Sequence, residues 1–173
     1  LMKFILMIIG FVGYAQFAGA QQFNSELSFK SHFTERKDSL DSIEGIWLVS
    51  STQEFYRYDT LYNIDKYPRA AKVAIINKGE FYDSYNLTGE SYDVSFYLTD
   101  VKGVYLYKNF FRTTNEYSNA QAVISTAGVM QYTYEFPDEY LRKQFGDSYE
   151  EGTRVVNLLT WKKIFPEETE GNR

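Results

Sequence analysis

Tyr92-Asp93-Val94-Ser95-Phe96-Tyr97-Leu98 is the stretch of this chain that most clearly shows its fold. Its even-numbered positions all carry large apolar side chains, whereas Asp93 and Ser95 between them are polar. Because successive side chains of a β-strand point to opposite faces, this alternation predicts a strand with one buried face and one solvated face. Strands buried on one side only are typical of antiparallel sheets.

Segments on both sides of this stretch have the same strand-like composition. The expected strands are residues 43–52, 70–76, 80–86, 101–111, 120–126, 131–136 and 153–165. Short turn signals containing glycine, at residues 77–79, 100–103 and 127–128, separate several of them, since glycine tolerates positive φ. About seven or eight short strands with no long helix between them predict an all-β fold, an antiparallel up-and-down barrel, with a β-sandwich as the alternative.

Three segments do not have this strand character. Residues 25–40 are polar and of mixed charge, which predicts a short weak helix or an irregular lead-in. Residues 54–69 are rich in Tyr and Asp and alternate only in part, so we expect a long loop there. Residues 137–146 begin with Pro, carry acidic residues first and basic residues later, and end with Gly. This order predicts one short helix before the last strand.

The first twenty residues have the order of a secretory signal peptide. Lys3 precedes the apolar run from Phe4 to Val12, and small residues lead up to Ala20. The run is much shorter than the roughly 20 apolar residues of a membrane span. We therefore expect cleavage after Ala20, export to the periplasm or the exterior, and no membrane span.

The expected domain organisation follows from these segments. It comprises a signal peptide (1–20), a polar lead-in (21–40), a β-barrel domain (41–166) and a disordered acidic tail (167–173).

The composition restricts both compartment and partners. The chain of 173 residues has no Cys and a formal net charge of −5. The absence of disulfides in an exported protein favours the periplasm or exterior of a bacterium as its location. The acidic balance has the wrong sign for phosphate-dominated binding, so we expect no nucleic acid partner. The 16 Tyr and 14 Phe favour half-buried pleated surfaces.

Gly45-Ile46-Trp47, at the start of the first long strand, resembles the Gly-x-Trp motif of lipocalins and their calycin relatives. In that family the Trp closes one end of an eight-stranded barrel, and a basic residue of the final strand packs across it. The resemblance implies that Lys162 or Lys163 has this role here. Together with residues 72–76 and the closing segment 161–166, the motif is also similar to exported domains of Bacteroidetes-type bacteria. The expected structural residues are Gly45, Trp47, Trp161 and Lys162.

Residues suited to catalysis are scarce. His32 is the only histidine and lies in the polar lead-in, so we expect an exposed spacer and neither a triad nor a histidine zinc site. The carboxylate pairs 138–139, 150–151 and 167–168 fall in expected turns or in the tail, where charged residues are ordinarily solvated. The oxygen-rich loop 59–65 lacks the Gly and the terminal Glu of an EF-hand. The sequence predicts no catalytic residue, no metal and no cofactor.

Two hypotheses for function lead, and an enzyme is the third alternative. The first is a barrel that binds a small apolar or amphipathic ligand. Its inward-facing candidates are Tyr92, Phe96, Tyr105, Tyr107, Tyr132 and Tyr134, although the same residues could simply fill the core. The second is a protein- or glycan-interaction module that uses tyrosines of the 54–69 loop, namely Tyr56, Tyr58, Tyr62 and Tyr67. Tyrosines around an enclosed void would favour the first hypothesis, and tyrosines across an open face the second.

Overall fold

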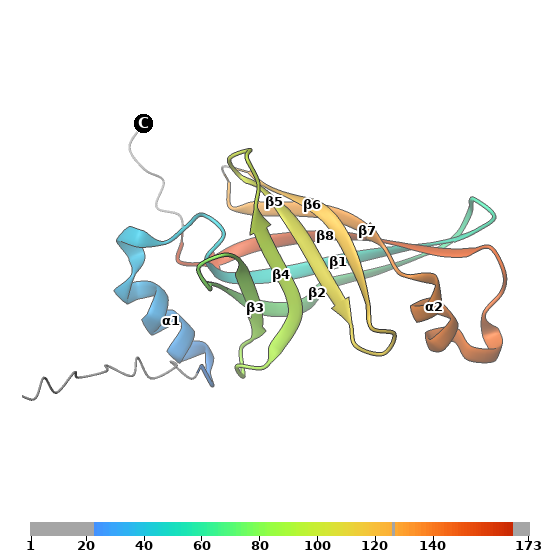
Figure 1. Cartoon of the computed structure of the whole chain (residues 1–173), viewed down its shortest axis with the longest axis horizontal. Helices are drawn as coiled ribbons and strands as arrows, with labels where there is room; N and C mark the ends of the chain where they lie inside the picture. Colours follow the sequence, from blue (N-terminus) through green and yellow to red (C-terminus); the bar gives the residue numbers. More distant parts are fainter. Residues whose placement is uncertain (1–22, 126, 168–173) are drawn as a thin grey trace, which may run out of the picture.

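The computed structural model describes residues 23–125 and 127–167, which form a closed barrel of antiparallel strands in sequential order (Figure 1). The expected signal peptide and residues 168–173 of the expected tail lie outside the described residues. The strands are β1 (Gly45–Arg57), β2 (Thr60–Asn77), β3 (Tyr82–Asn86), β4 (Ser91–Leu98), β5 (Val104–Phe111), β6 (Glu116–Ile124), β7 (Val129–Glu135) and β8 (Thr153–Phe165). Because β1 pairs with both β2 and β8, the sheet closes on itself. The up-and-down barrel is confirmed, and the sandwich alternative is wrong.

The barrel has two different ends. The start of β1 and the end of β8 meet at the closed end. The turns 78–81, 99–103 and 125–128 border the same end, and residue 126 of the last turn is not described. The opposite end, the mouth, carries the helix α2 (Asp138–Phe145) between β7 and β8. This is the short helix expected before the last strand, and it ends at Gly146 with a φ of 51°.

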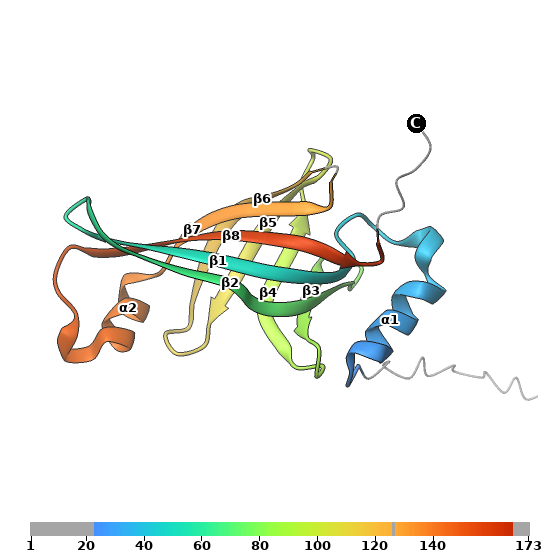
Figure 2. The same cartoon turned by 180° about the vertical axis from the view of Figure 1, so that it is seen from behind.

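Residues 54–69 are not a loop. They form the outer part of the β1–β2 hairpin, which extends past the mouth beside α2 (Figures 1 and 2). Register shifts between Val49 and Ser51 and between Phe55 and Tyr56 interrupt the alternation of side chains, which is why the segment reads as irregular. The hairpin turns through Tyr58 and Asp59, whose φ angles of 46° and 66° are those of a two-residue primed turn.

The polar lead-in contributes to the fold as a helix, α1 (Glu26–Glu35), which packs on the outside of the barrel. A capping box between Ser25 and Ser28 starts the helix. Phe29 and Phe33 are fully buried against β1 and β2, in a second small core that contains Ile46, Ala74 and Ile76. His32, expected to be an exposed spacer, is only 8% exposed, and burial is the main cause that lowers its pKa.

Trp47 lies at the closed end and is fully buried. Its Nε1 donates a hydrogen bond to the carbonyl oxygen of Ile43 at 2.9 Å. Lys163 lies over the indole ring, 5.3 Å from its centroid, and donates to the carbonyl oxygen of Ser42. Of the two candidate lysines, Lys163 therefore makes the contact with Trp47. Lys162, which we expected to be structural, is exposed on the outer face of β8.

Gly45 precedes Trp47 with a φ of 143°, and a Cβ there would collide with the carbonyl oxygen of Phe165 in β8. A glycine at this position lets the two strands approach closely as the barrel closes.

Leu98 differs from expectation. We expected it on the buried face of its strand, but it is 63% exposed where β4 ends.

Candidate binding pocket at the barrel mouth

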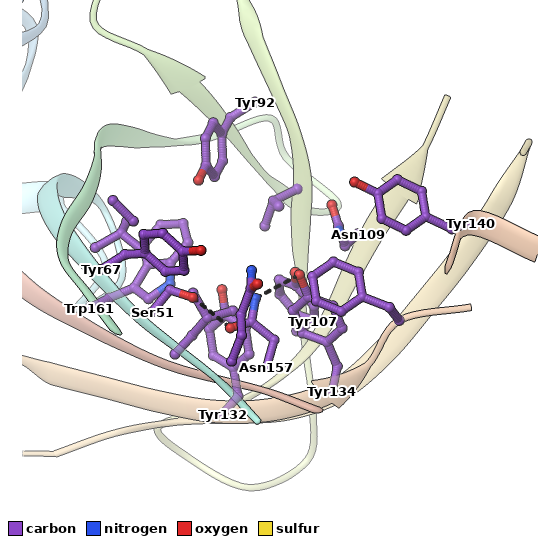
Figure 3. A pocket seen from close by; sticks show the side chains of 16 residues that line it. Ser51, Tyr67, Tyr92, Tyr107, Asn109, Tyr132, Tyr134, Tyr140, Asn157 and Trp161 are labelled. Atoms are coloured by element: carbon purple, nitrogen blue, oxygen red, sulfur yellow. Dashed lines mark hydrogen bonds between the residues drawn. The ribbon is translucent and has the colours of Figure 1, made fainter. Parts of the chain in front are cut away.

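The interior of the barrel is filled in one half and hollow in the other. Toward the closed end, the side chains of Trp47, Ile75, Tyr82, Phe96 and Tyr105 are buried in a continuous core. Toward the mouth lies a cavity of about 340 Å³ (Figure 3). This volume is at the lower end of the range for small-molecule sites, roughly 300–1,000 Å³.

Tyrosines dominate the wall of this pocket. Strand alternation places them there: in β7, Met130, Tyr132 and Tyr134 are buried, while the residues between them are exposed. In β8, Asn157, Leu159 and Trp161 face inward with the same period. The aromatic lining residues are Tyr67, Tyr92, Tyr107, Tyr132, Tyr134, Phe136, Tyr140 and Trp161.

The aromatic rings hold one another in place. The ring centroids of Tyr107 and Tyr132 are 4.2 Å apart, and Tyr107 stacks on Tyr134 at 5.6 Å. Phe96 contacts Tyr107, Tyr132 and Trp161 at 5.8, 6.3 and 5.7 Å. Aromatic pairs at such separations are favourable beyond the area they bury. The pocket is therefore built into a rigid cluster of rings.

A chain of hydrogen bonds crosses the pocket wall (Figure 3). The Ser51 hydroxyl donates to Asn157 Oδ1 at 2.7 Å, and Asn157 Nδ2 donates to the Tyr134 hydroxyl at 3.0 Å. The Tyr134 hydroxyl accepts this bond, so its own proton is not used in it. The chain fixes the Asn157 amide with its polar atoms satisfied.

Two further polar atoms of the wall are less well satisfied. The Tyr132 hydroxyl and Trp161 Nε1 are completely buried and have no partner in strict hydrogen-bonding geometry. The Tyr107 hydroxyl and the Trp161 indole nevertheless lie beside the Tyr132 hydroxyl and act on its pKa as hydrogen-bond donors. These groups therefore satisfy one another in part, and a molecule in the cavity does not reach the two buried atoms.

The pocket is electrically neutral. Among the described residues, no Lys, Arg, His, Asp or Glu lines it. Burial raises the pKa of the Tyr107 and Tyr132 hydroxyls well above the ordinary value and that of Tyr134 to about 12. All three tyrosines are therefore uncharged at neutral pH.

The structure separates the six predicted ligand-contacting residues into two groups. Tyr92, Tyr107, Tyr132 and Tyr134 line the pocket, whereas Phe96 and Tyr105 do not. Phe96 lies behind the pocket wall, and Tyr105 lies near the closed end, where its hydroxyl is 3.2 Å from that of Ser42.

The polar residues Ser51, Asn109 and Asn157 also line the pocket, although we did not predict them as site residues. For Asn157 the sequence does contain a pattern that indicates an inward-facing polar side chain. Asn157 is a polar residue in the buried register of β8, between Val155 and Leu159.

A second hollow of about 270 Å³ continues from the pocket beneath α2. It shares Gln53, Phe136 and Tyr140 with the main pocket. Its remaining lining is mostly apolar and comes from the hairpin, β8 and α2: Phe55, Val155, Leu141, Gln144 and Phe145. A ligand in the main pocket could therefore extend an apolar part between α2 and the hairpin.

The described residues show neither a metal site nor a membrane-spanning helix. They contain no group of three or more His, Asp or Glu side chains arranged to hold a metal ion. None of the helices in residues 23–125 and 127–167 has the length and apolar character needed to cross a membrane. Comparison with protein-family models, curated proteins and solved structures finds no match for this chain.

Proposed function

We propose that this protein binds a small uncharged or amphipathic molecule in the pocket at the mouth of its barrel. The observation that carries the proposal is the 340 Å³ cavity, whose wall combines packed aromatic rings with the polar side chains of Ser51, Asn109 and Asn157. An interior shaped only by packing would fill this space, because protein cores are close-packed. The apolar hollow beneath α2 supports a ligand that has both polar and apolar parts.

The proposal includes export before the ligand is bound. It is supported by the order of charge, apolar run and small residues in the first twenty positions. We expect that a Gram-negative host given the chain from Met2 onward secretes a product that begins at Gln21. N-terminal sequencing or intact mass of the exported protein tests this, and an exported product that still contains Lys3 would contradict it.

Titration with an uncharged, environment-sensitive fluorescent dye tests the pocket. We expect saturable binding with a stoichiometry near one, because one cavity is filled. Tyr107→Ala, which removes a wall of the pocket, should change the dye affinity. Tyr56→Ala is the matched control, since Tyr56 lies outside the pocket on the hairpin. Absence of saturable binding, or equal effects of the two variants, would overturn the proposal.

The hairpin supports a second candidate function, contact with a protein or glycan. Tyr58, Tyr62 and Tyr67 are 70%, 51% and 44% exposed, and Leu61 and Ile64 beside them are also exposed. Exposed tyrosines supply contact area at a low entropic cost. If this surface is the functional one, Tyr62→Ser should abolish retention on a glycan array or on a partner while dye binding in the pocket stays unchanged.

A further inference from the structure

Some polar groups of the pocket wall can be reached from the cavity and are not used by the chain itself. Tyr92 and Asn109 line the cavity and are only half-buried. Burial alone raises the pKa of the Tyr92 hydroxyl, with no contribution from a hydrogen bond. Within the part of the chain that the structure describes, the Asn109 amide makes no hydrogen bond either. Both groups are therefore available to a molecule in the cavity.

The reachable polar groups surround the cavity. In Figure 3 the hydroxyls of Tyr67 and Tyr92 point into the space from one side. Asn109 and the Tyr140 hydroxyl lie on the opposite side, and Asn157 lies between the two sides. All five residues line the pocket. A ligand that fills the cavity consequently meets polar groups around its whole rim.

These polar groups are all of one chemical kind. A phenol hydroxyl and a primary amide are neutral, and each can both donate and accept a hydrogen bond. No charged side chain is present in the described lining, so an ion would lose its hydration there without compensation. Hydroxyl groups match such a wall, because they also donate and accept. The pocket is therefore suited to an uncharged ligand that carries several hydroxyls.

Aromatic rings form the rest of the wall and suit the body of such a ligand. The face of an aromatic ring carries partial negative charge, which attracts weakly positive C–H groups. A sugar ring combines C–H groups on its faces with hydroxyls around its rim. The cavity of about 340 Å³ lies at the lower end of the range for small-molecule sites, which favours one sugar ring over an oligosaccharide.

We propose that the pocket binds the sugar ring of a neutral glycoside and that the apolar aglycone of this ligand lies in the hollow beneath α2. That hollow shares Gln53 and Tyr140 with the pocket, and apolar side chains such as Phe55, Phe145 and Val155 also line it. This inference rests on the proposed function and specifies its ligand class.

Four probes with the same hexyl tail test the inference by competition with the uncharged dye on the folded protein that begins at Gln21. Hexyl β-D-glucoside and hexyl β-D-galactoside carry the neutral sugar ring. Hexyl β-D-glucuronide adds a carboxylate to that ring, and triethylene glycol monohexyl ether is neutral but has no ring. We expect at least one hexoside to displace the dye at about tenfold lower concentration than the glucuronide or the ether, since one or two net hydrogen bonds are worth about that factor.

Tyr92→Phe and Asn109→Leu each remove one hydrogen-bonding group and keep most of the side-chain volume. We expect each to weaken binding of the hexoside about 3- to 10-fold and to leave binding of the ether unchanged. Tyr97→Phe and Asn119→Leu are the matched controls, because both residues lie outside the pocket, on β4 and β6. They should leave the affinity for every probe unchanged.

Urea denaturation separates ligand contact from a structural role. Because the chain does not use the two groups, Tyr92→Phe and Asn109→Leu should keep the urea midpoint of the parent protein while hexoside affinity falls. Hexosides that compete no better than the ether, preference for the glucuronide, or unchanged hexoside affinity in both variants would each overturn the glycoside assignment. The dye still binds saturably in all three cases, which distinguishes this failure from failure of the proposed function.

Discussion

Trp47 and Trp161 are both almost completely buried, but their indole N–H groups are in opposite situations. Trp47 donates to the Ile43 carbonyl oxygen at the closed end. Trp161 Nε1 lies in the wall of the pocket beside the Tyr132 hydroxyl, outside strict hydrogen-bonding geometry. A buried indole with a satisfied N–H stabilises the fold, whereas an imperfectly paired one contributes less. Trp47 is therefore the more firmly fixed of the two indoles.

Removal of the Trp47 side chain should strongly destabilise the protein. Trp47→Ala leaves a cavity beneath Lys163 and deletes the bond to Ile43, so we expect a loss of about 3–5 kcal/mol in the free energy of unfolding. Urea denaturation followed by circular dichroism measures it. A loss below about 1 kcal/mol would show that Trp47 does not hold the closed end together.

The two adjacent lysines should differ sharply in importance. Lys163→Met removes the contact with the Trp47 ring and the hydrogen bond to Ser42, so we expect a loss of about 1–2 kcal/mol. Lys162→Met is the matched control and should stay within about 0.5 kcal/mol, because Lys162 is exposed. The comparison of urea midpoints decides between them, and a larger effect at Lys162 would contradict the structure.

Among the secondary-structure elements, those with a clear local signal in the sequence could be predicted. β8 has the predicted bounds of Thr153–Phe165, and α2 lies where Pro137 and Gly146 predict a helix. The hairpin was missed because its bulges break the alternation and because Tyr58-Asp59 lacks the usual glycine. The docking of α1 could not be predicted, since burial of Phe29 and Phe33 depends on strands far along the chain.

The α1 helix offers a test of this outer core. Phe29→Ala should cost about 3–5 kcal/mol, because its ring is fully buried and stacks on Phe23 at 4.5 Å. Leu27→Ala in the same helix is the control and should change stability by less than about 0.5 kcal/mol, since Leu27 is 73% exposed. Equal thermal midpoints for the two variants would show that α1 does not dock on the barrel.

The hairpin turn should be improvable by glycine. Asp59 adopts a φ of 66°, and its side chain is 94% exposed, so its 3.7 Å ion pair with Arg154 contributes little. Asp59→Gly should therefore raise the free energy of unfolding by up to about 1 kcal/mol, because glycine has no Cβ to strain. A decrease in the urea midpoint would show that the ion pair outweighs the backbone strain.

At the scale of the whole molecule, the barrel combines a packed half with a hollow half. The alternating aromatic residues predicted which side chains point inward, but not which of them leave a space between them. Tyr105 and Tyr107 have the same sequence signal, yet only Tyr107 reaches the pocket. The difference depends on side chains from β4, β7 and β8 that meet only when the barrel closes. The cavity is therefore a property of the folded molecule.

The buried tyrosines should make the barrel sensitive to alkali. Burial raises the pKa of Tyr134 to about 12 and those of Tyr107 and Tyr132 well above the ordinary value, whereas in the unfolded chain tyrosine titrates near about 10. Above that pH the unfolded chain binds fewer protons than the native one, so stability falls as pH rises. The contribution is fully present below about pH 10 and is lost as the pH rises toward the native pKa values.

Urea midpoints between about pH 8 and 12, together with tyrosinate absorbance, measure this dependence. We expect exposed tyrosines to ionise reversibly near about pH 10, and the buried ones only as the barrel unfolds. Tyr132→Phe should reduce the alkaline loss of stability, because phenylalanine has no proton to release. Tyr62→Phe is the control, as Tyr62 is half exposed on the hairpin. An equally steep alkaline loss in both variants would mean that the Tyr132 hydroxyl is not held neutral by burial, and the uncharged character assigned to the pocket would fail with it.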